Sequence, residues 1–280
     1  MIKLGEIQNL TVVKKVEFGV YLAENGKNTE EKVLLPEKQV PEGTQEGDIL
    51  QVFIYRDSND RLIATTRNVM ITLGKVALLK VAQVAGIGAF LDWGLEKQLL
   101  LPFKEQTWQV QEGEECLAAL YIDKSNRLCA TMKVYHYLDT DSPYQKDDRV
   151  TGRVYEISRE FGAFVAVDDK YSGLISRKEM YGDIKEGDMV SARVAGVKED
   201  GKLDLSLREK AYLQIGTDAE KIMEVIEGYD GVLPFNDKAD PETIKNEMQM
   251  SKNEFKRAVG RLLKEGKIII EGNSIRKTGK

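Results

Sequence analysis

The sequence predicts a mainly β protein in which three small five-stranded barrels in tandem are followed by a small α+β domain. Three observations support this prediction. The stretch from residue 150 to 208 contains five short runs typical of β-strands, and two earlier stretches repeat its landmarks. After residue 217 the spacing of apolar residues changes from two to the helical period of about 3.6.

The strand pattern is clearest near the end of the stretch from 150 to 208. Leu203, Leu205 and Leu207 alternate with polar residues, so one face of this run is apolar and the other is polar. The preceding run shows the same alternation, and residues 199–201 (Glu-Asp-Gly) between the two runs are typical of a hairpin turn. Five short strands in about 60 residues predict a small closed barrel rather than a sandwich.

An internal repeat indicates that this barrel is the last of three. Residues 55–65 align with residues 121–131 at an offset of 66, whereas landmarks closer to the start of each copy are offset by 69. An insertion of three residues in the loop from Glu24 to Thr29 explains the difference. The Gly-Ala-Phe at 88–90 aligns in turn with residues 162–164, so we predict three barrels of one type.

The landmarks of the third barrel come in this order: Val150-x-Gly152-x-Val154, Phe161-Gly162-Ala163-Phe164-Val165, Gly173-Leu174-Ile175, Glu186-Gly187-Asp188-x-Val190 and Gly201-Lys202-x-x-Leu205-Ser206. The order closely resembles the RNA-binding OB-fold module named after ribosomal protein S-one. The resemblance implies that single-stranded RNA is contacted by Phe161, Phe164, Ser176 and Lys202. The predicted contact set also includes the basic residues Arg177, Lys178 and Arg193. Ser176 replaces the histidine usual in the family, so one ring of the expected binding surface is missing.

The two phenylalanines form one stacking platform only if the chain bends between them. Residues three apart on a regular strand point to opposite faces, so Phe161 and Phe164 share a face only if Gly162 introduces a bend or bulge. Two rings on one exposed face would stack on bases of any identity, because every base has a π face. The alternative is that one ring belongs to the barrel core, where aromatic side chains usually lie.

The first two barrels lack parts of this pattern. The first keeps two aromatic residues, Phe18 and Tyr21, whereas the second has Ile87 in place of the first ring. A basic residue remains at the hairpin position of both, as Arg61 and Arg127. We predict a secondary RNA site at Phe18, Tyr21 and Arg61, and we expect these barrels to act mainly as spacers or protein-contact surfaces.

Three helices and a hairpin are predicted after the third barrel, from residues that commonly begin and end such elements. The first and third helices begin at the capping boxes Thr217-x-x-Glu220 and Ser251-x-x-Glu254, and the second begins at Asp240-Pro241. Glycine ends the first and third helices, and a β-hairpin follows near the chain end. The third helix has the strongest apolar stripe, formed by Phe255, Ala258, Val259, Leu262 and Leu263.

This order of elements is similar to that of a winged-helix domain, in which the third helix carries nucleic-acid contacts. The residues that lie away from its apolar stripe are Asn253, Lys256, Arg257, Arg261 and Lys264. Residues 251–280 hold 9 Lys+Arg and 3 Asp+Glu, whereas residues 217–250 hold 3 and 9. The alternative is a solvated helix face in a domain that contacts protein.

Composition limits the possible functions. The formal net charge of −5 argues against a generally basic surface, so nucleic-acid binding would depend on local patches. The acidic excess lies in residues 1–148, which hold 17 Lys+Arg against 22 Asp+Glu. Cys116 and Cys129 lie in apolar runs, so we expect reduced cysteines that serve packing. Apolar runs are too short to span a bilayer, and residues 1–6 lack a signal peptide's apolar core, so we expect a cytoplasmic protein.

Candidate motifs for catalysis or for metal and cofactor binding fail on spacing. Residues 57–60 begin like a calcium loop, but Leu62 and Asn68 stand where glycine and glutamate are required. The only histidine, His136, lies in residues 134–148, which interrupt the strand pattern and predict a linker. We therefore expect a protein that is not an enzyme and that needs no cofactor or metal.

The predicted modules are a first barrel at 1–67, a second barrel with its linker at 68–145, a third barrel at 146–212 and a winged helix at 213–280. This arrangement resembles the bacterial conserved virulence factor B family over essentially the whole chain. The resemblance implies a non-enzymatic RNA-binding protein that regulates gene expression after transcription. Two alternatives stay open: a DNA-binding regulator led by the winged helix, and a protein-protein adaptor of an RNA-processing assembly.

Overall fold

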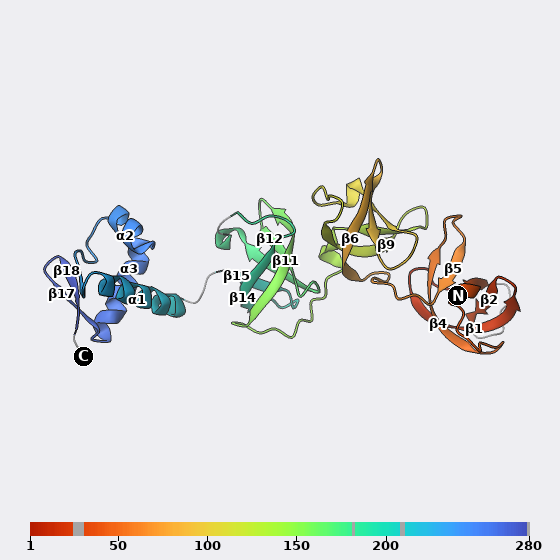
Figure 1. The fold of residues 1–280 in the computed structure, drawn as a ribbon, viewed down its shortest axis with the longest axis horizontal. Helices are drawn as coiled ribbons and strands as arrows, with labels where there is room; N and C mark the ends of the chain where they lie inside the picture. Colours follow the sequence, from red (N-terminus) through yellow and green to blue (C-terminus); the bar gives the residue numbers. More distant parts are fainter. Residues whose placement is uncertain (25–30, 181–182, 208–210, 279–280) are drawn as a thin grey trace. The chain divides into compact units, whose positions relative to one another are not determined.

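The computed structural model describes residues 1–24, 31–180, 183–207 and 211–278, with the backbone alone for 211–217. The chain forms two compact units, Met1–Leu207 and Arg208–Lys280. In Figure 1 the strands of the first unit run from red to green, and the helices of the second are cyan to blue. The insertion predicted in the loop from Glu24 to Thr29 falls on residues outside this description.

The first unit repeats one arrangement of five strands three times. The strands are β1 (Ile7–Val16), β2 (Gly19–Ala23), β3 (Lys32–Pro36), β4 (Ile49–Arg56) and β5 (Leu62–Thr65) in the first copy; β6 (Val76–Ala85), β7 (Gly88–Asp92), β8 (Leu99–Pro102), β9 (Glu115–Ile122) and β10 (Leu128–Thr131) in the second; and β11 (Arg149–Ser158), β12 (Gly162–Val167), β13 (Tyr171–Ser176), β14 (Met189–Val197) and β15 (Leu203–Ser206) in the third. A 3₁₀ turn follows the third strand of each copy: η2 (Glu37–Gln39), η3 (Phe103–Glu105) and η5 (Arg177–Glu179).

Two of the three copies close into barrels. The first has the strand order β1-β2-β3-β5-β4, and the third has the corresponding order β11-β12-β13-β15-β14. The second copy forms a sheet in the order β10-β9-β6-β7-β8, with β10 and β8 as its edges. The predicted repeat of five-stranded barrels is therefore confirmed, and the second copy is nearly closed, because its edge strands β10 and β8 lie side by side without forming a ladder.

The first strand of every copy is bulged at the same place. The register shifts lie between Val12 and Lys14, between Val81 and Gln83, and between Val154 and Glu156. A bulge increases the bend of a strand, which lets one strand pair with two neighbours in a small barrel. In the third copy the residue at the shift is Tyr155, which is fully buried.

Residues predicted to form a linker instead pack between the second and third barrels. Val134, in the turn η4 (Val134–His136), and Leu138 are buried in an apolar cluster with Tyr155 of β11 and Ala166 of β12. The Thr107 hydroxyl of the second barrel donates a 3.0 Å hydrogen bond to the carbonyl of Tyr155. The segment joins the two barrels, as a linker does, but its apolar residues are buried between them.

The first and second barrels also share apolar packing. Phe53 of β4 lies in the core cluster of the second barrel, where its ring meets Trp93 edge-on with the centroids 5.7 Å apart. The backbone N–H of Leu73 donates a 2.7 Å hydrogen bond to the carbonyl of Gly5. These contacts hold the two barrels together independently of the exposed polar groups nearby.

The second unit contains three helices and a three-stranded sheet. Its elements are α1 (Ala211–Gly228), β16 (Val232–Leu233), α2 (Pro241–Met248), α3 (Lys252–Lys264), β17 (Ile268–Glu271) and β18 (Ser274–Lys277), with the sheet order β16-β18-β17. The predicted starts of α2 and α3 are confirmed: Asp240 accepts from the Thr243 N–H at 2.9 Å, and Ser251 and Glu254 form a complete capping box.

Two details of this unit differ from the prediction. Helix α1 begins at Ala211, six residues before Thr217, because a threonine three residues ahead of a glutamate also fits a helix interior. The side chain of Thr217 itself lies outside the described residues. Leu263 is 39% exposed, so the apolar stripe of α3 is narrower than predicted.

None of the helices in the described part of the chain is both long and apolar enough to cross a membrane.

Candidate nucleic-acid interface

The third barrel carries the predicted pair of phenylalanine rings in contact with each other. Phe161 precedes β12 and is 55% exposed, whereas Phe164 lies on β12 and is half-buried. Their ring centroids are 6.4 Å apart. Gly162 has φ of 120°, and a Cβ there would lie 2.2 Å from the carbonyl oxygen of Ile175. Only glycine fits this bend, which brings the two rings together outside the barrel core.

A groove of about 900 Å³ runs between the second and third barrels, and both phenylalanines line it. Tyr135, from the turn that joins the two barrels, contributes a third ring, which meets Phe164 edge-on at 5.6 Å. Lys133, Lys198 and Lys202 line the same groove. Aromatic rings and ammonium groups in one groove are the two components with which proteins bind single-stranded nucleic acid.

Lys202, one of the predicted contact residues, lines this groove. Its Nζ is 2.7 Å from a carboxylate oxygen of Asp200 and 5.2 Å from the ring centroid of Tyr135. The hydrogen bond with Asp200, followed by that with Tyr135, raises the pKa of Lys202, so its ammonium stays charged at neutral pH. The groove therefore holds a partly buried ammonium beside the ring of Tyr135.

Phe161 also borders a second hollow, which contains three more of the predicted residues. Ser176, Arg177 and Lys178 are exposed there, beside Glu160. Ser176 pairs with Gly162 across β12 and β13, so it lies directly beside the bend between the rings. The Arg177 guanidinium donates a hydrogen bond to the carbonyl of Arg159. The predicted residues on β13 and η5 therefore extend the surface on one side of Phe161.

Arg193 is the predicted contact residue that the fold places elsewhere. It lies on β14, where its guanidinium is 2.9 Å from a carboxylate oxygen of Asp147 and its side chain is only 21% exposed. Among the described residues, those that line the groove or the hollow do not include Arg193. The sequence shows that Arg193 points out of the barrel, but not which side of a closed barrel it occupies.

Tyr135, Lys133, Lys198 and Glu156 line the groove without having been predicted. The Tyr-His-Tyr run at 135–137 was a usable signal, since an exposed linker seldom holds three adjacent rings. Glu156 pairs with Phe164 in the ladder of β11 and β12, so it places a carboxylate beside the rings. The groove is therefore mixed in charge and is not a uniformly basic surface.

The first barrel has a similar pair of rings. Phe18 is 57% exposed and meets Tyr21 edge-on at 6.4 Å, and Lys32 Nζ lies 4.8 Å from the Tyr21 ring centroid. Arg61 is held by Asp57 in its own hairpin, with 2.7 Å between guanidinium and carboxylate. Burial raises the pKa of Asp57, but hydrogen bonds from the backbone and guanidinium of Arg61 outweigh it and leave the pKa low.

The predicted residues of α3 lie on the exposed face of that helix. The exposed set comprises Asn253, Lys256, Arg257, Arg261 and Lys264. Arg261 is ion-paired with Glu265 at 2.7 Å. Hydrogen bonds from Arg261 and then Lys267 lower the pKa of Glu265 to about 2, so this pair persists at neutral pH. Arg257 and Lys264 are thus better placed than Arg261 to meet a ligand.

The described residues also bear on other kinds of site. Within them, His, Cys, Asp and Glu side chains do not gather in groups of three or more that could hold a metal ion. His136 is exposed, with its ring 5.0 Å from that of Tyr135. Cys116 and Cys129 are buried free thiols, as expected for packing residues.

Three repeats of one five-stranded topology, followed by three helices and a small sheet, define a modular protein of β-barrels and a winged helix. A model of the S1 domain matches residues 4–67 and 73–133, and a model of the second domain of virulence regulatory factor CvfB matches 136–209. A model of the CvfB-like winged helix domain matches 220–276. The chain belongs to the conserved virulence factor B family.

Two relatives and one solved structure are similar to nearly the whole chain. Conserved virulence factor B of Staphylococcus saprophyticus is 31% identical over 99% of this chain and 95% of its own length. The uncharacterized protein YitL of Bacillus subtilis is 31% identical over 95% of this chain and 91% of its own. A solved multidomain protein with nucleic acid binding domains from Streptococcus pneumoniae is 23% identical over 98% of both chains, with a TM-score of 0.49.

Proposed function

We propose that this protein binds single-stranded RNA in the groove of the third barrel, with the winged helix contributing. It acts in the cytoplasm, without catalysis, as a regulator of gene expression after transcription. The observation that carries the proposal is the exposed Phe161 ring, which is held against Phe164 in a groove lined by lysines.

The groove suits a flexible strand better than a duplex. The ring centroids of Phe161 and Phe164 are 6.4 Å apart, and those of Phe164 and Tyr135 are 5.6 Å apart. Successive unstacked bases can each use one of these rings, and stacking contributes about 1–3 kcal/mol per base. Lys198 and Lys202 supply positive charge for the phosphates, which a protein with a net charge of −5 needs locally.

The strand topology supports an OB-type assignment for the barrels. The order of first, second, third, fifth and fourth strands closes the first and third copies, and a 3₁₀ turn follows the third strand. Small barrels of this type bind oligonucleotides on an outer face and its adjoining loops. We assign the modules to 1–67, 68–145, 146–212 and 213–280, with the main RNA site on the third module and additional nucleic-acid contacts on the fourth.

The regulatory role is supported by the family. The relatives called conserved virulence factor B match nearly the whole chain, and the model matched by residues 136–209 describes a virulence regulatory factor. A protein of barrels and a winged helix, with an aromatic groove as its candidate site, regulates by binding. Recognition of a transcript is the form of regulation that this groove fits.

A titration of the full chain with three ligands tests the proposal. Single-stranded RNA, single-stranded DNA and duplex DNA of equal length are compared at two salt concentrations. We expect the tightest binding to single-stranded RNA, with affinity that falls as salt rises. A preference for duplex DNA would instead favour a regulator led by the winged helix. No binding of any of the three would favour a protein-protein adaptor.

A further inference from the structure

The second barrel retains parts of the surface proposed to bind RNA in the third. Phe90 of β7 takes the place of Phe164 in the repeat, and Arg127 holds the basic position of the last hairpin, as Lys202 does in the third barrel. Both line a groove of about 280 Å³ between the first and second barrels. A ring and a guanidinium in one groove are again suited to a base and a phosphate.

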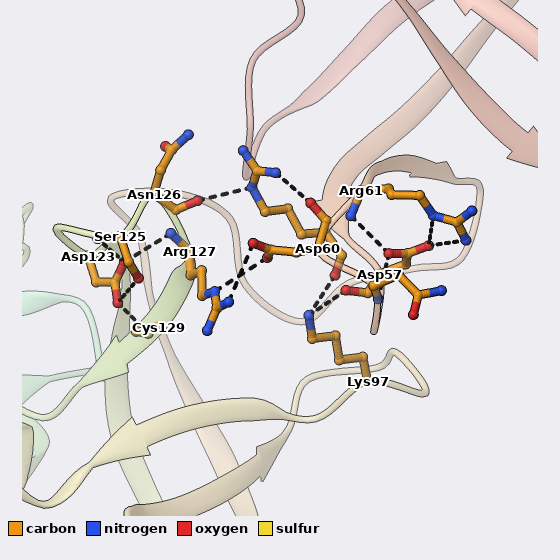
Figure 2. Close-up of polar contacts among 11 residues, drawn as sticks. Asp57, Asp60, Arg61, Lys97, Asp123, Ser125, Asn126, Arg127 and Cys129 are labelled. Carbon is orange, nitrogen blue, oxygen red and sulfur yellow. Dashed lines mark hydrogen bonds and ion pairs between the residues drawn. The ribbon is translucent and has the colours of Figure 1, made fainter.

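The hairpin between β4 and β5 of the first barrel lines this groove as well, and its polar groups contact the second barrel (Figure 2). Arg56 Nε donates a 3.0 Å hydrogen bond to the carbonyl of Asn126. Lys97 Nζ donates to the carbonyls of Arg56 and Asp57 at 3.0 Å and 2.7 Å. At the hairpin tip, a carboxylate oxygen of Asp60 lies 3.4 Å from the guanidinium of Arg127.

The arginines of the two hairpins have different binding partners, although the hairpins are copies of one repeat. In the first barrel the Arg61 guanidinium binds Asp57 of the same hairpin at 2.7 Å. In the second, the equivalent Asp123 accepts hydrogen bonds from the backbone N–H of Arg127 and from Ser125. The Arg127 guanidinium turns away from its own hairpin toward Asp60 (Figure 2).

We propose that Asp60 occupies the place of a phosphate in a second binding site for single-stranded RNA, formed by Arg127 and Phe90. The inference rests on the proposed function and adds a site to it. A guanidinium takes carboxylate and phosphate as its preferred anionic partners. The pair is exposed, at 60% for Arg127 and 45% for Asp60, so the carboxylate is held weakly and a phosphate can displace it.

Displacement of Asp60 leaves the barrels docked. The apolar contact of Phe53 with Trp93 lies in the core of the second barrel, and the hydrogen bond from Leu73 to Gly5 belongs to the backbone. Neither contact depends on the hairpin tip. The bound RNA strand therefore gains a contact on the second barrel without unfolding either barrel, and the linked sites reinforce each other.

The test is Asp60→Asn, with Glu96→Gln as its matched control. Asp60 has φ of 64°, a conformation that asparagine tolerates, so the variant keeps the turn. Glu96→Gln removes the same charge from another exposed ion pair, that with Arg67 at 2.7 Å. We expect Asp60→Asn to tighten binding of a long single-stranded RNA about two- to five-fold at low salt. We expect Glu96→Gln to change it less than about twofold.

Arg127→Ala in both backgrounds identifies the source of the gain. It should weaken RNA binding by the wild type only about twofold at low salt, because the phosphate must first displace Asp60, and it should abolish the gain of Asp60→Asn. Equal gains from Asp60→Asn and Glu96→Gln would overturn the inference, as would a gain from Asp60→Asn that persists in the Arg127→Ala background. If RNA binds and depends on Phe161 while Asp60→Asn has no effect, only this inference fails. If the wild type binds no RNA, the proposed function fails as well.

Discussion

Replacement of Phe161 by alanine is the sharpest test of the proposed RNA-binding surface. The ring is 55% exposed and lines both the groove and the neighbouring hollow, so it is available to a base without any rearrangement. Loss of one stacked base costs about 1–3 kcal/mol, which is roughly a five- to 150-fold loss of affinity. Since Phe164 remains in place, we expect the lower part of this range, about ten-fold.

The same exposure limits the cost to folding. Complete burial of a phenylalanine contributes about 1.5–3 kcal/mol, so a ring less than half buried contributes about 1 kcal/mol. Phe164→Ala should weaken binding further, but it also removes packing against Tyr135 and Tyr155, whose ring centroids lie 5.6 Å and 6.1 Å away. Phe161→Ala is therefore the cleaner variant for separating binding from stability.

Phe18→Ala provides a matched control in the first barrel. That ring is 57% exposed and also has its partner ring 6.4 Å away, so the two substitutions remove equivalent groups. Affinity for a single-stranded RNA is measured by fluorescence anisotropy, with melting curves for each variant. If the Phe161→Ala variant is folded and its RNA affinity falls by less than about twofold, Phe161 and Phe164 do not form a stacking platform for bases. An equal loss from Phe18→Ala would move the main site to the first barrel.

Two further predictions concern the winged helix and the cysteines. Reversal of Arg257 and Lys264 to glutamate should weaken RNA binding and make the dependence of log affinity on log salt less steep by about 1.4. Lys245→Glu on α2, the control, should change neither the affinity nor this slope. A slope that stays the same after reversal of Arg257 and Lys264 would assign α3 to a protein partner. Burial raises the pKa of Cys116 to about 12 and of Cys129 to about 11, so at pH 8 roughly one Cys129 in a thousand is thiolate. A thiol reagent should therefore label the folded protein far more slowly than the denatured one, and rapid labelling without denaturant would contradict the described burial.

The revised position of the interface changes how fragments of this protein should be made. A fragment that begins at residue 146 keeps the third barrel but loses Lys133, Tyr135 and the cluster that buries Tyr155. The RNA affinity of this fragment would then be changed both by the loss of part of the groove and by newly exposed apolar surface. Substitutions in the full chain avoid this ambiguity, because each removes one group and leaves the packing between the barrels in place.

Local regularities in the sequence were enough to predict most elements. Alternation of apolar and polar residues determines which side of a strand faces the core, and it correctly placed Leu203 and Leu205 inside the third barrel. The bend at Gly162 followed from the sequence only as a condition, since two rings three residues apart share a face only across such a bend, and the structure has that bend. Capping motifs predicted the start of α3 because their hydrogen bonds join residues three positions apart.

The interface itself depended on contacts between distant residues, which no local pattern encodes. The sequence alone determined that the chain repeats a five-stranded unit and ends in a helical domain, because periodicity and capping are properties of neighbouring residues. Only the tertiary structure showed that Arg193 binds Asp147, that Tyr135 completes the groove and that Asp60 meets Arg127. The partners in these contacts come from different strands, turns or barrels. Their pairing therefore depends on how the barrels close and pack, which is decided only once the whole unit has folded.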